Sequence, residues 1–180
     1  MTILVIGGSA SGKSEFAEQL AVSMGEKRFY VATMEPFGAE GAARIARHRE
    51  MRAERGFETV ERYTDIASLF EGGDARSASE GVVPTVALLE DIGNLVANEI
   101  FTVGGENVAE RVTEGVLSLA AQCGTLVVVS NDISRDAERY DAETSDYLAA
   151  VGDVNRRLAA VFDEVYEVTN GVAAKIKGAL

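Results

Sequence analysis

The sequence predicts an α/β fold in three layers: a mostly parallel central sheet with helices on both faces, closed by an antiparallel hairpin at the C-terminal end. Short apolar runs typical of buried strands alternate with segments whose apolar residues recur every three to four positions, as on one face of a helix. Near the end of the chain, Asn170-Gly171 separates two further strand-like runs, and this dipeptide is typical of a tight hairpin turn.

The expected elements follow this alternation from the N-terminus. Strands are expected at 3–6, 29–33, 82–89, 125–130, 164–169 and 172–176. Helices are expected at 14–24, 42–55, 64–70, 92–101, 108–122 and 143–162. The first two strands and the helix between them should form a β-α-β unit with parallel strands. The run 125–130 is very apolar and is expected near the centre of the sheet.

Composition narrows the class of protein. The chain has 180 residues, 47% of them hydrophobic, and a formal net charge of -12, which disfavours binding to nucleic acid or an anionic membrane through bulk charge. The one cysteine, Cys123, excludes an internal disulfide. No apolar run approaches the ~20 residues that span a bilayer. Because the chain opens directly on a predicted strand, we expect no signal peptide and a cytoplasmic enzyme.

A glycine-rich loop lies between the first predicted strand and the first predicted helix. It matches the phosphate-binding pattern G-x-x-x-x-G-K-[ST] with Gly7, Gly8, Ser9, Ala10, Ser11, Gly12, Lys13 and Ser14. Its glycines let backbone N–H groups turn toward phosphate oxygens, and the helix start adds its positive end. Lys13 should reach the terminal phosphates and Ser14 should join the coordination of Mg²⁺.

The context of this loop, after a strand and before a helix, favours phosphate binding over a chance glycine turn. The sequence therefore predicts a P-loop NTPase-like fold, with residues 1–180 forming a single nucleotide-binding catalytic domain. No repeat or linker divides the chain.

An acidic pair, Glu90 and Asp91, directly follows the strand expected at 82–89. Ligands of open α/β sheets bind at the carboxyl ends of the strands, so either carboxylate could hold Mg²⁺ directly or through water. The alternative is an exposed acidic turn in a chain that has 29 acidic residues.

The only histidine, His48, lies in a segment rich in arginine. Five of the 17 basic residues fall between positions 44 and 55, and helical spacing places His48 on one face with Arg44, Arg52 and Arg55. On an acidic protein this pattern suggests an anion site. Neighbouring cations favour a neutral imidazole, which is a competent nucleophile toward phosphorus or a general base. A solvated helix face is the alternative reading.

Together these residues resemble the adenosylcobinamide kinase / adenosylcobinamide-phosphate guanylyltransferase family of cobalamin biosynthesis. The matches keep the family's order along almost the whole chain. They comprise residues 3–14, Tyr30–Thr33, Ala43–Arg49, Leu88–Asp91, Asn98, Gly104–Asn107, Val129–Asp132, Gly152–Ala159 and Gly171–Lys177.

The resemblance implies an enzyme with two activities, which uses GTP or ATP and Mg²⁺ and works as a homotrimer. It would phosphorylate the aminopropanol hydroxyl of adenosylcobinamide and then transfer GMP from GTP to that phosphate. His48 would carry the GMP, with Lys13 as the other catalytic residue. Nucleotide contacts beyond the loop are implied for Thr33, Met34, Arg52, Glu61 and Glu90, and metal contacts for Ser14 and Glu90.

Two other functions fit the same residues. A P-loop small-molecule kinase without a covalent step would transfer phosphate without needing His48. A non-catalytic nucleotide-binding subunit would bind nucleotide and turn over no corrinoid. Neither class is expected to bind nucleic acid or insert into a membrane.

Overall fold

The computed structural model describes residues 1–36, 52–70, 85–133 and 140–179, and its strands form one seven-stranded sheet. In chain order the strands are β1 (Thr2–Gly7), β2 (Arg28–Ala32), β3 (Phe57–Glu61), β4 (Val86–Glu90), β5 (Thr125–Asn131), β6 (Glu164–Thr169) and β7 (Val172–Lys177).

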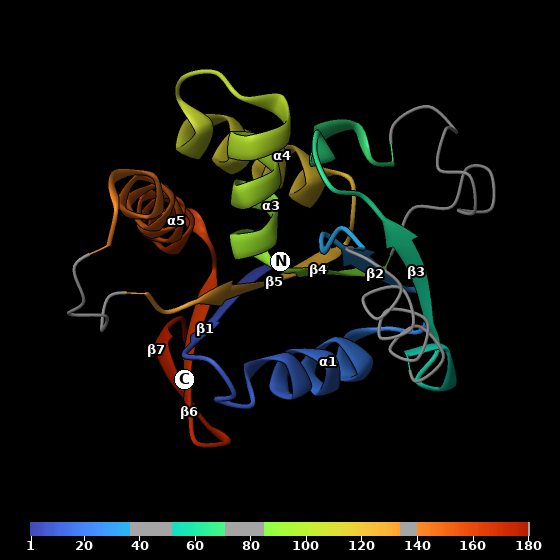
Figure 1. The fold of residues 1–180 in the computed structure, drawn as a ribbon. Helices are drawn as coiled ribbons and strands as arrows, with labels where there is room; N and C mark the ends of the chain where they lie inside the picture. The colour runs from blue at the N-terminus through green and yellow to red at the C-terminus, as the bar shows by residue number, and fades with distance from the viewer. Residues whose placement is uncertain (37–51, 71–84, 134–139, 180) are drawn as a thin grey trace.

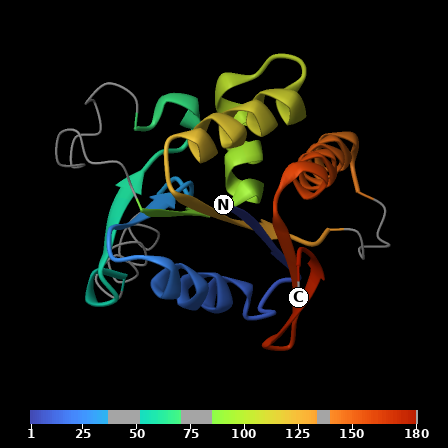
Figure 2. The same ribbon diagram turned by 180° about the vertical axis from the view of Figure 1, so that it is seen from behind.

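Helices cover both faces of this sheet (Figure 1). The described α-helices are α1 (Lys13–Met24), α3 (Ile92–Asn98), α4 (Val108–Ala121) and α5 (Ala142–Val161). Helix α1 lies on one face, and α3, α4 and α5 lie on the other; Figure 2 shows the same layers from behind. The predicted three-layer α/β fold is therefore confirmed.

The sheet order is β3-β2-β4-β5-β1-β6-β7, and every neighbouring pair is parallel except β6 and β7. The position of β5 in the middle of the sheet is as its apolar sequence predicts. Strands β1 and β2 are parallel, as expected, but β4 and β5 lie between them. The C-terminal hairpin is also confirmed: Asn170 and Gly171 both have positive φ, 51° and 79°, as a tight turn of this type requires.

One strand was not predicted. β3 contains only two buried residues, Phe57 and Val60, among Glu and Thr side chains, so its sequence lacks the apolar character expected of a strand in a parallel sheet. It lies at the edge of the sheet and pairs with β2 alone. Pairing with β2 in the folded protein, and not local strand propensity, therefore makes this segment a strand.

Three predicted boundaries are wrong. Within the strand expected at 82–89, Thr85 is in a bend and the strand runs from Val86 to Glu90, while 82–84 lie outside the described residues. The helix expected at 64–70 is only a 3-10 turn, Ile66–Ser68. The helix expected at 92–101 ends at Asn98 and continues as a π-helical turn, Glu99–Val103, closed by a hydrogen bond from Gly104 N to Glu99 O.

The short 3-10 turn has a physical cause in helix α4. The backbone N–H of Phe70 donates to the side chain of Gln122 at 2.9 Å, and the Ala67 carbonyl accepts from Ser118 Oγ at 2.8 Å. Ser118 of α4 and Gln122, which follows the last residue of α4, therefore satisfy backbone groups that a longer helix would have paired internally.

The helices on the α3–α5 face bury the larger of two apolar clusters. Leu158 of α5 is fully buried in it, together with Leu4 of β1 and Val128 of β5. The smaller cluster lies on the α1 face and includes Ala17, Ala21 and Tyr30.

A Leu158→Ala variant should lower the free energy of unfolding by about 2–5 kcal/mol, because it removes buried methyl groups and leaves a cavity. Urea denaturation followed by circular dichroism measures this loss. The matched control is Leu117→Ala on α4, whose side chain is 39% exposed and should change the free energy by about 0.5 kcal/mol. Equal losses in the two variants would contradict the packing of α5 on the sheet.

Candidate nucleotide and metal site

The carboxyl ends of six parallel strands lie at one edge of the sheet. In the strand register Gly7 lies opposite Asn131, and Ala32 lies opposite both Glu90 and Glu61. The glycine-rich loop leaves β1 at this edge and enters α1. The loop, Glu90 and Glu61 therefore lie along one edge, as expected for a ligand site in an open α/β sheet.

Two glycines of the loop are required by its geometry. A Cβ at Gly7 would lie 2.4 Å from Ser11 Oγ and 2.6 Å from the Val168 carbonyl oxygen, which no side chain can tolerate. Gly12 has φ of 89°, a conformation that L side chains rarely adopt. These two glycines let the loop curl tightly between β1 and α1.

Lys13 is the first residue of α1 and is only 8% exposed. Its Nζ donates to the Gly8 carbonyl at 3.1 Å, so the side chain folds back over the loop. The C-terminal hairpin supports the loop from outside, because Gly171 N donates to the Ser11 carbonyl at 2.8 Å. A cationic side chain is thus held above the backbone that is predicted to contact phosphate.

Ser14 and Glu90 lie together at the carboxyl end of β4. Ser14 Oγ donates to Glu90 Oε1 at 2.6 Å. Among the described residues Glu90 Oε2 is buried and accepts no hydrogen bond of normal geometry, although the carboxylate lies close enough to Tyr30 that burial and the charge of Glu90 both raise the pKa of the Tyr30 phenol. A hydroxyl and a carboxylate with one oxygen left without a hydrogen bond suit Mg²⁺, which takes few protein ligands and completes its shell with phosphate and water. Asp91 does not share this position: its side chain caps α3 by accepting from Asn94 N at 2.7 Å.

The described residues contain no group of three or more His, Cys, Asp or Glu that could hold a metal ion. A resident metal cage is therefore not part of the described structure. The pair of Ser14 and Glu90 fits a metal ion that arrives with nucleotide phosphates.

Thr33 ties the ends of β2 and β4 together. Its Oγ1 accepts from Asp91 N at 2.7 Å, and the amide of Asn98 donates to the Thr33 carbonyl at 2.8 Å. The peptide bond between Glu90 and Asp91 is cis. Thr33 is fully buried, so it positions the acidic pair and presents no free surface to a ligand.

Two further residues predicted to contact nucleotide are exposed. Met34, next to Thr33, is 36% exposed. Glu61 is exposed at the end of β3, where its carboxylate accepts from the Tyr63 hydroxyl at 3.0 Å.

Arg52 lies on the α1 side of the sheet, next to the P-loop helix. Its guanidinium carbon is 3.4 Å from the centroid of the Tyr30 ring, a cation–π contact. Its Nε is 3.8 Å from Glu18 Oε1, and Glu18 also pairs with Arg55. Burial raises the pKa of Glu18, the charge of Arg55 opposes this rise, and the charge of Glu90 adds to it.

Glu18 is a residue of this neighbourhood that the sequence reasoning missed. It lies one helical turn after Ser14 on α1, so the i, i+4 rule could have placed both side chains on one face. Its two arginine partners come from the arginine-rich segment, and this joins the end of that segment to the P-loop helix.

His48 and the arginines before position 52 lie outside the described residues. Of the predicted arginine helix at 42–55, positions 52–55 are described; 52–54 are helical and Arg55 is in a turn. The role of His48 therefore stays a prediction.

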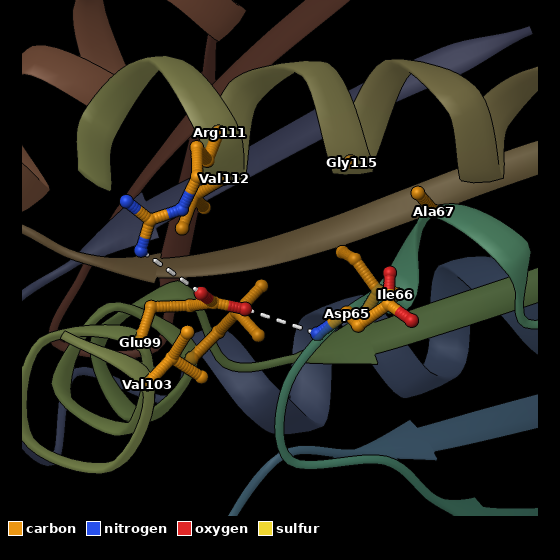
Figure 3. A pocket seen from close by; sticks show the side chains of 9 residues that line it. Asp65, Ile66, Ala67, Glu99, Val103, Arg111, Val112 and Gly115 are labelled. Atoms are coloured by element: carbon orange, nitrogen blue, oxygen red, sulfur yellow. Dashed lines mark hydrogen bonds and ion pairs between the residues drawn. The ribbon is translucent and has the colours of Figure 1, made fainter. Parts of the chain in front are cut away.

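A separate pocket of about 240 Å³ lies between α3, α4 and the segment after β3 (Figure 3). Glu99 points across it, accepting from Asp65 N at 3.0 Å and pairing with Arg111 Nη2 at 3.2 Å. Arg111 Nη2 also donates to the Gly104 carbonyl at 3.0 Å. These charges are paired with each other and with the chain, so they stabilise this corner of the fold and leave the pocket unsuited to phosphate.

No helix among the described residues is long and apolar enough to cross a membrane.

Known proteins resemble this chain along nearly its whole length. The model of the family described as "Cobinamide kinase / cobinamide phosphate guanyltransferase" matches residues 3–176. The chain is similar to the Bifunctional adenosylcobalamin biosynthesis protein CobU of Escherichia coli (strain K12), with 31% identity over 98% of this chain and 100% of that protein. It is 32% identical to the protein of the same name from Salmonella typhimurium, again over 98% and 100% of the two chains.

Among solved structures, the KaiC-like protein PH0186 from Pyrococcus horikoshii OT3 is similar with a TM-score of 0.53 and 14% identity, over 98% of this chain and 78% of that one. This likeness supports the fold alone. The match along residues 3–176 and the two full-length relatives show that the chain belongs to the cobinamide kinase / cobinamide phosphate guanyltransferase family.

Proposed function

We propose that this chain catalyses both reactions of its family in a single domain. It would phosphorylate the hydroxyl of adenosylcobinamide with a nucleoside triphosphate, and then transfer GMP from GTP to the new phosphate. One observation carries the proposal: Lys13, Ser14 and Glu90 lie at one sheet edge in a chain that matches the family from residue 3 to residue 176.

For the first reaction, the loop from Gly7 to Ser14 would hold the triphosphate, with Lys13 stabilising the charge that develops on the terminal phosphate. The hydroxyl oxygen of the acceptor forms a bond to the γ-phosphorus as the bond to the β–γ bridging oxygen breaks. The nucleoside diphosphate leaves, and the hydroxyl proton is lost. Contacts from Met34, Arg52 and Glu61 to the nucleotide are part of this proposal.

For the second reaction, a nitrogen of His48 would attack the α-phosphorus of GTP, release pyrophosphate and hold GMP as a phosphoramidate. A phosphate oxygen of adenosylcobinamide phosphate then displaces the histidine, giving adenosyl-GDP-cobinamide. Support comes from the lone histidine in a cationic segment and from the contacts of Arg52 and Arg55 with α1, beside the loop.

Ser14 and Glu90 would hold Mg²⁺ bound to the phosphates, where it would neutralise phosphate charge.

The variant Glu90→Gln tests this metal site. It keeps a side-chain oxygen that can accept from Ser14 but removes the negative charge. We expect the Mg²⁺ concentration for half-maximal phosphoryl transfer to rise about tenfold or more. Mg²⁺ titrations of the kinase reaction measure this shift. Glu26→Gln, at an exposed position before β2, serves as the control. The same Mg²⁺ dependence in both variants would argue against a metal at Glu90.

The decisive experiment is incubation with adenosylcobinamide and GTP, followed by mass spectrometry of the products and of the protein. Adenosyl-GDP-cobinamide with GMP on the protein supports the proposal. Adenosylcobinamide phosphate alone would indicate the kinase without a covalent step, and nucleotide binding without turnover would indicate a non-catalytic subunit.

We further propose that the protein is a cytoplasmic homotrimer. This proposal rests on the family resemblance, and sedimentation equilibrium tests the oligomeric state.

A further inference from the structure

Three polar side-chain atoms converge around Gly93, at the start of α3. A Cβ placed on Gly93 would lie 3.0 Å from Asn131 Nδ2, 3.0 Å from the Tyr147 hydroxyl oxygen and 3.2 Å from Asp91 Oδ1. These side chains come from the ends of β4 and β5 and from α5, so only the folded chain brings them together. We call this group, Asp91, Asn131 and Tyr147, the polar triad.

Two members of the polar triad have unused hydrogen-bonding capacity. Within the described ranges, no hydrogen bond engages the Tyr147 hydroxyl or the side-chain amide nitrogen of Asn131, and both residues are partly exposed. Burial raises the pKa of Tyr147, and the Asp91 carboxylate adds to this rise, so the phenol stays protonated and able to donate. The triad thus offers a carboxylate acceptor and two donors within a small space.

The polar triad adjoins the phosphate-binding loop. Asn131 lies opposite Gly7 in the β1–β5 register, and Asp132 N donates to the Gly7 carbonyl at 2.9 Å. Asp91 directly follows Glu90, which accepts from Ser14. A group bound to the triad would therefore lie beside the loop, on the α3–α5 face of the sheet and across it from α1.

Tyr147 also lines a pocket of about 270 Å³. Its other described lining residues are Ala97, Phe101, Glu143 and Thr144, so its walls are partly apolar and its polar groups are neutral or acidic. No cation is among these described lining residues. The pocket suits an uncharged ligand with apolar and amide parts better than it suits an anion.

We propose that the polar triad binds the hydroxyl of the acceptor, and that the adjoining pocket holds the amide-linked arm that carries this hydroxyl. The inference rests on the proposed phosphoryl transfer. An alcohol can donate one hydrogen bond to the Asp91 carboxylate, which also accepts from Asn94 N, and can accept one each from Tyr147 and Asn131, so a single hydroxyl can engage all three members. The pocket volume admits an arm of the acceptor and excludes its macrocycle, which would lie outside against Phe101, whose side chain is 58% exposed.

The test is steady-state kinetics of the kinase reaction with adenosylcobinamide in Tyr147→Phe and Phe101→Ala. Each variant should raise the KM for adenosylcobinamide about tenfold, because one loses a hydrogen bond to the substrate and the other an aromatic contact. The KM for the nucleotide should stay unchanged. Tyr166→Phe and Val161→Ala are matched controls away from the pocket; Tyr166 donates to Glu164, and Val161 is exposed at the end of α5.

The outcomes separate this inference from the proposed function. If the wild type phosphorylates adenosylcobinamide and both variants keep its KM within twofold, the acceptor site is wrong and the function stands. An equal rise in the KM for the nucleotide would mean a general structural effect and also overturn the inference. If the wild type shows no phosphorylation, the proposed function fails, and the proposed acceptor site is then tested by absorbance titration of the protein with cobinamide. Weaker cobinamide binding in both variants than in the wild type would uphold the site. No binding to the wild type, or equal binding to the wild type and the variants, would overturn it.

Discussion

Replacing Lys13 by Met should lower kcat/KM for phosphoryl transfer by about 10²–10³-fold. The side chain is buried and its Nζ donates to the Gly8 carbonyl of the loop, so we expect its charge to act on the terminal phosphates of a nucleotide held there. Preorganised charge of this kind acts mainly in the transition state, so its loss lowers the rate more than it lowers nucleotide affinity. Guanylylation of the protein by GTP should fall as well, since the same loop is proposed to hold both nucleotides.

The measurement is kcat/KM from a coupled assay for the nucleoside diphosphate, with thermal unfolding to check that the variant folds. Lys13 Nζ makes one hydrogen bond to the loop, so little stability should be lost. Lys27→Met, on the exposed turn before β2, removes the same charge away from the site and should behave like wild type. Wild-type turnover in Lys13→Met would rule out this lysine as a catalytic residue.

Replacing His48 by Ala should abolish transfer of GMP while leaving phosphorylation of adenosylcobinamide within about threefold of wild type. Loss of a covalent nucleophile typically costs on the order of 10⁴-fold or more. The reason for the separation is chemical: the kinase step needs no protein nucleophile, whereas the proposed guanylyl step proceeds through the histidine. The two half-reactions can be followed in one preparation by product mass.

The covalent intermediate provides a direct test. Radiolabelled GTP should leave a label on the wild-type protein that is labile to acid and stable to alkali, as expected of a phosphoramidate. Since His48 is the only histidine in the chain, a label on histidine can have only one position. Lys13→Met serves as the companion variant, because it should label weakly while retaining His48. Equal labelling of His48→Ala and wild type would eliminate the covalent route and favour a kinase without it.

Much of the candidate site could be predicted from the sequence because its signals are local. The glycine pattern from Gly7 to Ser14 encodes its own loop, and the acidic pair after a strand marks the edge where ligands bind. The structure places Ser14 Oγ 2.6 Å from Glu90 Oε1, as that reasoning expected of two metal ligands. The assignment of these residues to bound nucleotide and metal stays a prediction that the variants above test.

Other parts of the site depend on residues that are distant in the chain. Gly171 supports the loop through Ser11 across 160 positions of sequence, and Glu18 pairs with Arg52 and Arg55. No periodicity or motif encodes such contacts, because each depends on how strands are ordered in the sheet. The same holds for β3, whose polar sequence becomes a strand only through pairing with β2.

By itself, the sequence determined the α/β class, the phosphate-binding loop, the position of the acidic pair and the C-terminal hairpin. Each of these follows from neighbouring residues, through strand propensity, glycine conformation or turn chemistry. Only the tertiary structure decided the separation of β1 from β2 by two other strands and the meeting of Asp91, Asn131 and Tyr147 around Gly93. The physical reason is that burial of apolar faces selects the strand order, and contacts between distant residues form only once that order is set.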